Sequence, residues 1–167
     1  MKIFKPETLK CGYMTDPIGI DDVKPLLSWT IAGTVSGIMQ AAYRISASRN
    51  KEALIDGACD LWDSGEVESS ESFGITYGGK TLKTGEKCWW IVMVRDIEGD
   101  WSEPSETAYF EAGIMDRKEW KASFIGLPEH FNPRSKQAEV QAGPPLPLLR
   151  KNAVIMKAIR SALAYVT

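Results

Sequence analysis

The chain has 167 residues, of which 44% are hydrophobic and 25% are charged, and its formal net charge is −2. These proportions are ordinary for a folded globular chain and exclude an intrinsically disordered one. The nearly balanced charge, with Lys and Arg scattered along the sequence, gives no electrostatic argument for nucleic acid or an anionic membrane as a partner. We therefore expect one ordinary domain, or one small domain and a piece of another.

Metal, cofactor and nucleophile motifs are absent from the sequence. The three cysteines, Cys11, Cys59 and Cys88, form no C-x-x-C pair, and His130 is the single histidine, so zinc-finger spacing is excluded. No phosphate loop, nucleophile elbow or HExxH occurs. We expect free, mostly buried thiols, a solvated His130, and neither cofactor nor metal. Residues 1–6 lack an apolar signal core, which favours the cytoplasm, with the periplasm or secretion as the alternative if a leader was removed.

Two strands and a loop are predicted in the first 48 residues. The first 25 residues carry many turn residues and predict a short edge segment near residues 9–13, followed by a loop. Residues 26–31 predict a strand. Residues 39–48 show the most regular alternation in the chain, which predicts a strand with one buried and one solvated face. The predicted buried face consists of Ala41, Tyr43, Ile45 and Ala47.

Short elements are predicted between residues 50 and 77. Residues 50–55 could form one helical turn, and residues 61–67 read as a short strand that runs into a turn. Residues 73–77 predict another strand, with Phe73, Ile75 and Tyr77 on one side.

The dominant feature is the run of seven apolar residues at 88–94. It is too short for a membrane span, which needs roughly 20 apolar residues. Turn residues bound it on both sides, so its length and punctuation favour a strand over a helix. Both faces are apolar, which predicts a central strand covered on both sides for part of its length. Residues 107–112 predict the last strand of the set.

About seven short strands without a long helix predict an all-β fold for residues 1–114. The pattern is typical of an immunoglobulin-like or fibronectin-III-like antiparallel β-sandwich. The second form fits better because a Cys…Trp…Cys framework is missing. We expect a linker at 115–147, with a helical turn capped by Asp116 and a Pro-rich loop, and a strand at 120–125. Two strand-like runs, 148–157 and 159–167, predict the start of a second, incomplete β-sandwich.

Several motifs follow one another in a defined order along nearly the whole chain. They are PLLSW at 25–29, AAYRISAS at 41–48, LWDSGEV at 61–67, WIVMVRD at 90–96, WSEP at 101–104, FEAG at 110–113 and the stretch 116–125. Together they resemble the N-terminal region of bacterial α-L-rhamnosidases of the glycoside hydrolase 78 type. The tail, PLLRK at 147–151 and AIRSA at 158–162, resembles the opening strands of the next β-sandwich in those enzymes. The sequence departs from the pattern at Cys88, where such proteins usually carry a tyrosine.

The resemblance implies a non-catalytic accessory module. The catalytic part of the family is a large helical (α/α)6 barrel that carries the acidic residues, and none of it is present here, so no catalytic residue is assigned. The implied roles are packing, spacing and carbohydrate contact. The implied partners are the remainder of the parent enzyme, another copy of the chain, or rhamnose-containing glycans. Two alternatives stay open: a stand-alone fibronectin-III-like module that binds a glycan or a protein, and a truncated remnant of a gene.

Six tryptophans suggest sugar-stacking platforms in such a context. Trp29 and Trp90 lie on strand faces that read as internal and are predicted to be core. Trp62 and Trp101 lie near strand ends or turns and are the candidates for carbohydrate contact. Glu98 and Asp100 flank Gly99 at a predicted hairpin tip, where a solvated turn is expected rather than a metal site.

Overall fold

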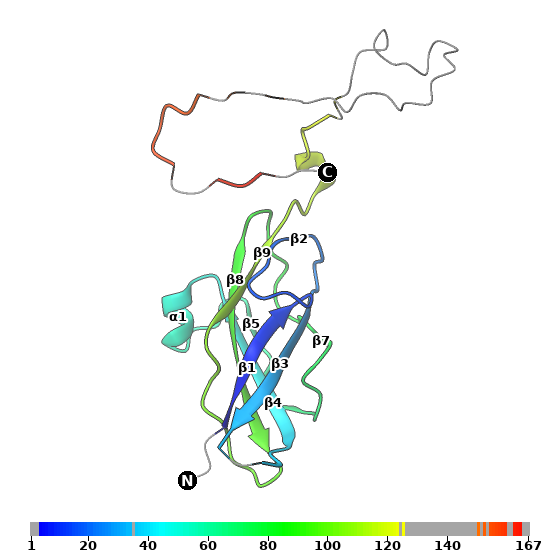
Figure 1. The fold of residues 1–167 in the computed structure, drawn as a ribbon, viewed down its shortest axis with the longest axis vertical. Coiled ribbons are helices and arrows are strands. Elements are labelled where there is room, and N and C mark those ends of the chain that lie inside the picture. The colour runs from blue at the N-terminus through cyan, green and yellow to red at the C-terminus, as the bar shows by residue number, and fades with distance from the viewer. Residues whose placement is uncertain are drawn as a thin grey trace, which may run out of the picture. The chain divides into compact units, whose positions relative to one another are not determined.

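The structure is a computed structural model, and it describes residues 4–34, 36–123, 125, 150, 152, 154–159 and 162–164. The chain divides into two compact units, Met1–Lys121 and Ala122–Thr167. The elements in chain order are β1 (Phe4–Cys11), β2 (Ile18–Ile20), β3 (Leu26–Gly33), β4 (Gln40–Ser48), α1 (Lys51–Ile55), β5 (Trp62–Asp63), β6 (Val67–Glu68), β7 (Ile75–Thr76), β8 (Lys87–Asp96), β9 (Ala108–Ala112) and η1, a 3₁₀ turn (Arg117–Glu119) (Figure 1).

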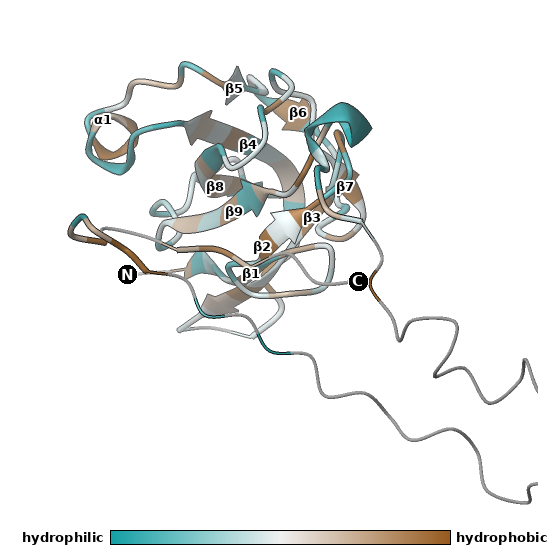
Figure 2. Ribbon diagram, turned by 90° about the horizontal axis from the view of Figure 1, so that it is seen from above, coloured by the Kyte–Doolittle hydropathy of each residue, from teal (hydrophilic) through white to brown (hydrophobic). Residues whose placement is uncertain are grey.

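The first unit is an all-β sandwich of two sheets. A three-stranded sheet has the order β1-β3-β7, and a larger sheet has the order β2-β9-β8-β4-β5, with β6 also paired to β4. All the pairings are antiparallel except the short contact of β2 with β9. Seen from above, β1 and β3 lie on one side and β4, β8 and β9 on the other (Figure 2). The predicted immunoglobulin-like or fibronectin-III-like fold class is confirmed.

The apolar run at 88–94 forms the middle of β8, as predicted. β8 pairs with β4 on one side and with β9 on the other. Its inward face is fully buried, and its opposite face is half-buried. The inward residues Cys88, Trp90, Val92 and Val94 are 0 to 1% exposed. Burying each large apolar side chain stabilises the fold by roughly 1.5–3 kcal/mol.

Aromatic rings from both sheets interlock in the core. Trp29 of β3 meets Tyr43 of β4 edge to face, with ring centroids 5.3 Å apart. Tyr77, directly after β7, meets Phe110 of β9 in the same way at 5.5 Å. Trp29 and Trp90 are 3% and 1% exposed, so the prediction that both belong to the core is confirmed.

Two serine hydroxyls close the flank of β8 that β9 does not reach. The backbone N–H of Val94 donates to the Ser102 Oγ at 3.0 Å, and the N–H of Val92 donates to the Ser105 Oγ at 3.1 Å. The serine N–H groups return bonds to the carbonyls of the same two residues, at 2.8 and 2.9 Å. The segment WSEPS thus pairs with β8 although Pro104 lacks an N–H group.

Two expectations for the first 26 residues were wrong. The predicted segment 9–13 is instead the end of β1, which stops at Cys11 because Gly12 and Tyr13 both have positive φ. The predicted loop before residue 26 contains β2. The predicted short strand that runs into a turn at 61–67 is found as β5 and a turn at Gly65, whose φ is 63°, and β6 begins at Val67.

The predicted strand 73–77 is reduced to β7, and Phe73 does not share the core face with Tyr77. Gly74, with a φ of 70°, turns the backbone directly after Phe73. Phe73 is 61% exposed, whereas Tyr77 is 1% exposed. The helical turn expected at 50–55 is confirmed as α1, whose cap Asn50 accepts a bond from the Ala53 N–H.

The prediction of one buried and one solvated face on β4 is corrected on both faces: Ala42 and Ser48, on the face expected to be solvated, are 0% and 2% exposed, and the buried face changes at one position. A shift of register between Gln40 and Ala42 makes Ala41 a bulge, so the polar Gln40 enters the core in its place. Gln40 is 6% exposed. Its Oε1 accepts from the Trp29 Nε1 at 3.0 Å, and its Nε2 donates to the carbonyls of Ser69 and Glu71. One amide therefore ties β3, β4 and the segment after β6 together.

Few described residues test the predictions for the C-terminal part. The predicted turn capped by Asp116 is confirmed as η1, where the Asp116 carboxylate accepts from the Lys118 N–H. Residues 120–123 and 125 carry no strand, contrary to the strand predicted at 120–125. The Pro-rich loop lies outside the described residues, as does much of 148–167. The described residues of that last stretch are not in a strand, and its prediction as the start of a second β-sandwich stays a prediction.

We predict that Gln40→Leu lowers the free energy of unfolding by about 2–3 kcal/mol, because it keeps the side-chain volume and leaves buried partners without bonds. The control is Met39→Ala at the exposed neighbouring position, which should change stability by less than about 0.5 kcal/mol. Urea unfolding monitored by tryptophan fluorescence measures both. Equal stability of Gln40→Leu and the wild type would show that the amide network contributes nothing.

Candidate functional surfaces

Trp62 is built into the edge of the core. Its ring meets the buried Tyr77 edge to face at 5.3 Å. Gly78 and Gly79 lie directly against it: a Cβ on Gly78 would stand 3.0 Å from the indole, and one on Gly79 would stand 2.7 Å from the Trp62 Cβ. The two glycines are therefore required by this close approach, and the half-buried ring offers only part of its surface to a ligand.

Trp101 has more of its ring available. It is 38% exposed and forms an isolated bridge with Arg95 of β8. It lines a hollow of about 270 Å³ together with Arg44, Glu66 and Met93. An aromatic ring beside a guanidinium and a carboxylate combines an apolar platform with hydrogen-bonding groups. The contacts of Trp62 and the lining of this hollow share no residue, so the two predicted candidates belong to different surroundings.

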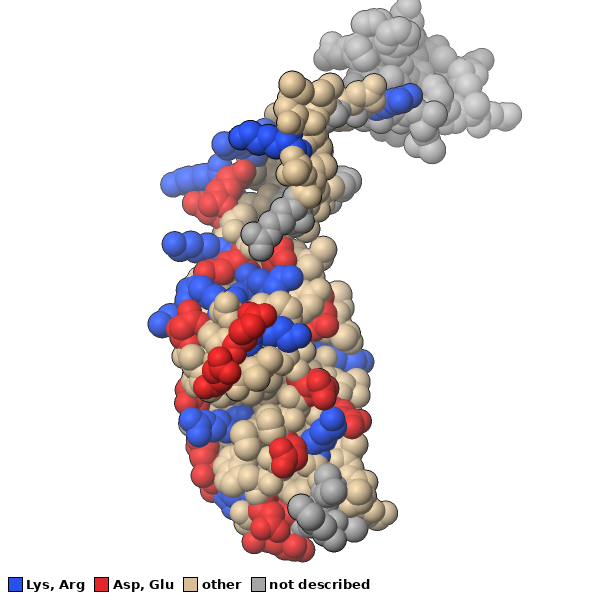
Figure 3. All heavy atoms as spheres, turned by 90° about the vertical axis from the view of Figure 1, so that its left-hand side faces the viewer, with Lys and Arg blue, Asp and Glu red and all other residues tan. Residues whose placement is uncertain are grey.

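Ion pairs surround this hollow and continue over the larger sheet. Arg44 binds both carboxylate oxygens of Asp63, at 3.0 and 2.6 Å, and Arg95 bonds the Glu66 Oε1 at 2.8 Å. Further pairs are Arg95 with Glu68, Arg49 with Asp60 and Glu86, and Lys87 with Glu111. Such exposed pairs each contribute about 0–1 kcal/mol. Acidic and basic side chains are interleaved over the face shown in Figure 3, without a large patch of one sign.

Local hydrogen bonding acts on the Asp60 carboxyl more strongly than its partial burial does. Burial by itself raises its pKa, but bonds from the Arg49 N–H, the Ser48 hydroxyl and the Arg49 guanidinium outweigh it and hold the pKa at about 2.

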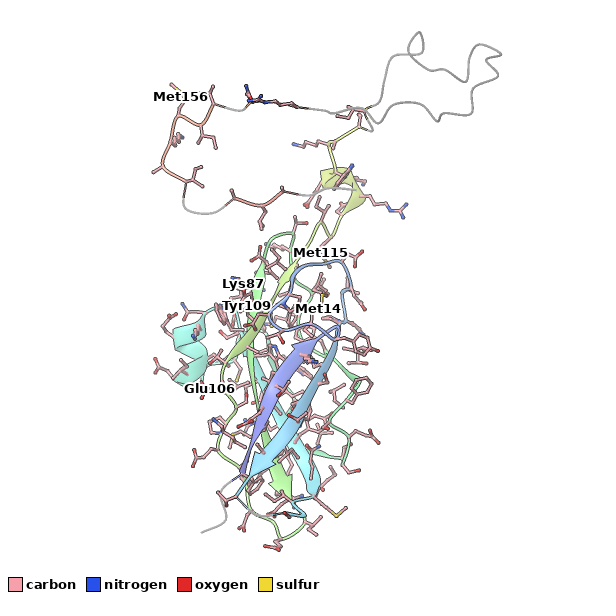
Figure 4. All side chains as sticks on the ribbon, viewed as in Figure 1. Met14, Lys87, Glu106, Tyr109, Met115 and Met156 are labelled. Carbon is pink, nitrogen blue, oxygen red and sulfur yellow. The ribbon has the colours of Figure 1, made fainter. Side chains whose placement is uncertain are left out.

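Near the start of β8, the Lys87 ammonium stands 4.1 Å from the centre of the Tyr109 ring (Figure 4). The Trp89 ring packs on the Tyr109 ring, with centroids 4.9 Å apart. The charged groups near this end of β8 are thus paired with one another or with aromatic rings.

The hairpin after β8 brings three carboxylates together. The ligand oxygens of Asp96, Glu98 and Asp100 lie within 4.8 Å of one another. Asp96 is buried, and its Oδ1 accepts from the N–H groups of Glu98 and Asp100, both at 2.9 Å. The Asp96 carboxylate therefore shapes the turn.

The two thiols in the core lack the lowered pKa of a reactive cysteine. Cys11 and Cys88 are buried free thiols, and Cys59 is half-exposed. Burial raises the pKa of both core thiols to about 12, with a smaller contribution from Asp22 at Cys11. His130 lies outside the described residues.

A cleft of about 340 Å³ separates β1 from the start of β9, and it is bridged by Lys5 and Glu106 at 3.5 Å. The exposed edge of β1 beside it is unsuited to pairing with another strand. Pro6 has no N–H to donate, and a bulge at Thr8, with a φ of 51°, interrupts the ladder. The cleft therefore marks a protected sheet edge.

Most of the exposed apolar side chains of the first unit come from the stretch around β2 and from Phe73. Ten large apolar residues described in the first unit are exposed. Five of them lie between residues 13 and 26, and a sixth is Phe73. We call these six the apolar end; they are Tyr13, Met14, Ile18, Val23, Leu26 and Phe73. The rings of Tyr13 and Phe73 are 66% and 61% exposed and lie 5.7 Å apart. Sequence reasoning missed this pair, although Gly12 and Gly74 beside the two rings were signals of turns.

Tyr13 stands in a conformation that a bulky residue rarely adopts. Cys11 and Met14 exchange two backbone bonds around Gly12 and Tyr13, whose φ values are 55° and 68°. Both residues are thus left-handed, as in the tight turns of β-hairpins, which favour Gly and Asn. The backbone at Tyr13 is strained, and an observed strain of this kind often accompanies function.

Comparison with known proteins identifies the family. The model described as "Rha78A-like, N-terminal immunoglobulin domain" matches residues 6–116. The chain belongs to this family. The resemblance to the N-terminal region of α-L-rhamnosidases is thereby confirmed.

Individual α-L-rhamnosidases are similar to this chain in sequence and in structure. An α-L-rhamnosidase from Alteromonas sp. (strain LOR) is 32% identical over 166 residues, which is 98% of this chain and 18% of the relative. The solved α-L-rhamnosidase from Dictyoglumus thermophilum matches with a TM-score of 0.70 at 35% identity, covering 74% of this chain and 14% of that one. The Streptomyces avermitilis enzyme, solved in complex with L-rhamnose, gives 0.71 at 32% identity, covering 77% and 12%.

The chain spans 11 to 18% of the length of the curated relatives it matches. Its similarity therefore concerns one small region of each enzyme. None of the helices within the described residues has the length and apolar character needed to cross a bilayer.

We predict that Tyr13→Asn leaves the free energy of unfolding of this chain unchanged or raises it by up to about 1 kcal/mol, because Asn relieves the left-handed strain and the lost ring is largely exposed. Phe73→Asn is the matched control, since it removes the same ring contact without relieving strain. Chemical unfolding of both variants gives the difference. A Tyr13→Asn chain less stable than Phe73→Asn would contradict the strain at this turn.

Proposed function

We propose that this chain is the non-catalytic N-terminal accessory module of an α-L-rhamnosidase-like glycoside hydrolase, in which it packs against and spaces the remainder of the enzyme. The observation that carries the proposal is the family membership of residues 6–116, combined with the small share of each relative that the chain covers. The proposed boundaries are a sandwich at 1–114, a linker at 115–147 and the start of a second sandwich at 148–167. A cytoplasmic location stays an expectation.

The surroundings of the acidic residues support a non-catalytic role. Glycoside hydrolysis generally uses two carboxyl groups on either side of the scissile bond, one of them in an apolar setting that keeps it protonated. In the β1–β9 cleft, Glu106 is 94% exposed and pairs with Lys5, and the Asp16 Oδ1 accepts from the Tyr109 N–H. Glu66 in the Trp101 hollow is paired with Arg95. Each of these three carboxylates thus faces a basic side chain or a backbone N–H group, and the apolar setting of a general acid is not found around them.

We predict no turnover of an aryl α-L-rhamnoside by the purified 167-residue chain. In the full-length parent enzyme, deletion of residues 1–121 should shorten the half-life at elevated temperature, because packing surface is lost, while activity on the small aryl substrate at low temperature is kept. Measured turnover by the chain alone would overturn the proposal. So would a deletion that leaves the thermal half-life unchanged.

Carbohydrate contact is a second candidate function, and the hollow at Trp101 favours it. An exposed indole flanked by Arg44 and Glu66 can stack on the apolar face of a sugar and bond its hydroxyls. Trp62, enclosed by Gly78 and Gly79, is the weaker of the two candidates. Rhamnose-containing glycans are the proposed ligands, on the evidence of the relatives' names alone.

We predict that methyl α-L-rhamnoside shifts the NMR signal of the Trp101 indole N–H, with an affinity in the millimolar range typical of one stacked sugar. The Trp62 indole serves as the internal control and should not move. Trp101→Ala should abolish the remaining shifts around Arg44 and Glu66. Titration without a shift at Trp101, or with equal shifts at both indoles, counts against this site.

A further inference from the structure

We propose that the apolar end of the sandwich is the surface through which this module docks on the remainder of its parent rhamnosidase polypeptide. The inference rests on the proposed function and names the contact surface within it. Tyr13 and Phe73 are the centre of this surface, because their rings touch each other and both are mostly exposed. The partner is an apolar protein surface.

The strained backbone at Tyr13 supports a role in binding. A large aromatic side chain occupies a left-handed turn position where Gly or Asn would be more stable. Within this module the ring contacts Phe73, which is itself exposed, so little core packing is gained. Exposed rings held on a rigid tight turn are suited to binding, because they lose little conformational freedom when they are buried.

Two other surfaces of the sandwich are less suited to protein docking. The face of the larger sheet carries the ion pairs of Arg44 and Arg95, whose burial would require desolvation of charges. The edge of β1 is blocked by Pro6 and the bulge at Thr8, which prevents addition of a strand. The apolar end combines exposed apolar side chains with polar neighbours such as Asp22, in the arrangement of an apolar centre and a polar rim.

The chain also passes close to the apolar end after β9. The Gly113 N–H, directly after β9, donates to the Ile20 carbonyl at 2.7 Å. Val23 of the apolar end and Met115 line the same small hollow. Figure 4 shows Met14 and Met115 at the same end of the sandwich. The polypeptide thus leaves β9 beside the apolar end, so a short connection suffices to bring later parts of a longer enzyme to this surface.

The chemistry of the surface selects a protein partner over a glycan. Sugar sites need several convergent hydrogen-bonding groups around an aromatic platform. The members of the apolar end are Tyr, Met, Ile, Val, Leu and Phe, and the tyrosine hydroxyl is the one polar group among their side chains. Methionine and aromatic residues are enriched at the centres of protein interfaces.

Hydroxyl-radical footprinting tests the proposal directly, because Tyr, Met and Phe side chains report their own exposure. The 167-residue chain and the full-length parent enzyme are oxidised in parallel. We expect Tyr13, Met14 and Phe73 to be protected several-fold in the parent. Met39 and Ile97, exposed in the loops before β4 and after β8, are the internal controls and should react equally in both proteins. Unprotected rings, or protection of the controls instead, would overturn the proposal.

A pair of double variants supplies the second readout. Tyr13→Asn/Phe73→Asn should lower the melting temperature of the parent more than it lowers that of the 167-residue chain, whereas Met39→Asn/Ile97→Asn should not. Equal effects of Tyr13→Asn/Phe73→Asn in both proteins would place the docking surface elsewhere. If deletion of residues 1–121 also leaves the stability of the parent unchanged, the proposed function itself fails. If the deletion destabilises the parent but Tyr13→Asn/Phe73→Asn does not, the docking inference alone fails.

Discussion

The inward face of β8 is the constraint on which the rest of this structure depends. Its four side chains from Cys88 to Val94 are almost completely removed from water, and they can be covered only if a second sheet lies opposite. β4 and β9 fix the position of β8 from either side, and the smaller sheet supplies Leu27 and Trp29 as the facing layer. Every surface discussed above is held in place by this burial.

Much of the fold could be predicted because it follows from patterns of a few residues. The central strand, the strands near 26–31 and 107–112, the helical turn and the cap at Asp116 all depend on local alternation, length and turn residues. The bulge at Ala41 could not be predicted, because it exchanges an apolar residue for Gln40, whose burial is compensated by three partners on two distant segments. Such compensation exists only in the assembled sandwich.

The surfaces were less accessible to sequence reasoning. The sequence indicated Trp101 as a candidate because it is a tryptophan near a turn, and its ring is exposed in the structure. The sequence could not reveal that two glycines lie against Trp62. Tyr13 and Phe73 are 60 residues apart in sequence, and their contact depends on turns at Gly12 and Gly74. Alternation assigns Phe73 to the core face, and only the change of backbone direction at Gly74 moves it outward.

The hydroxyls of Ser102 and Ser105 have a consequence for solubility. An apolar strand such as β8 is open to pairing with another molecule wherever its backbone groups are left unpaired. Each serine hydroxyl accepts from one amide of β8 beyond the end of β9. The segment that contains Pro104 thereby covers backbone groups that a neighbouring molecule could otherwise bond.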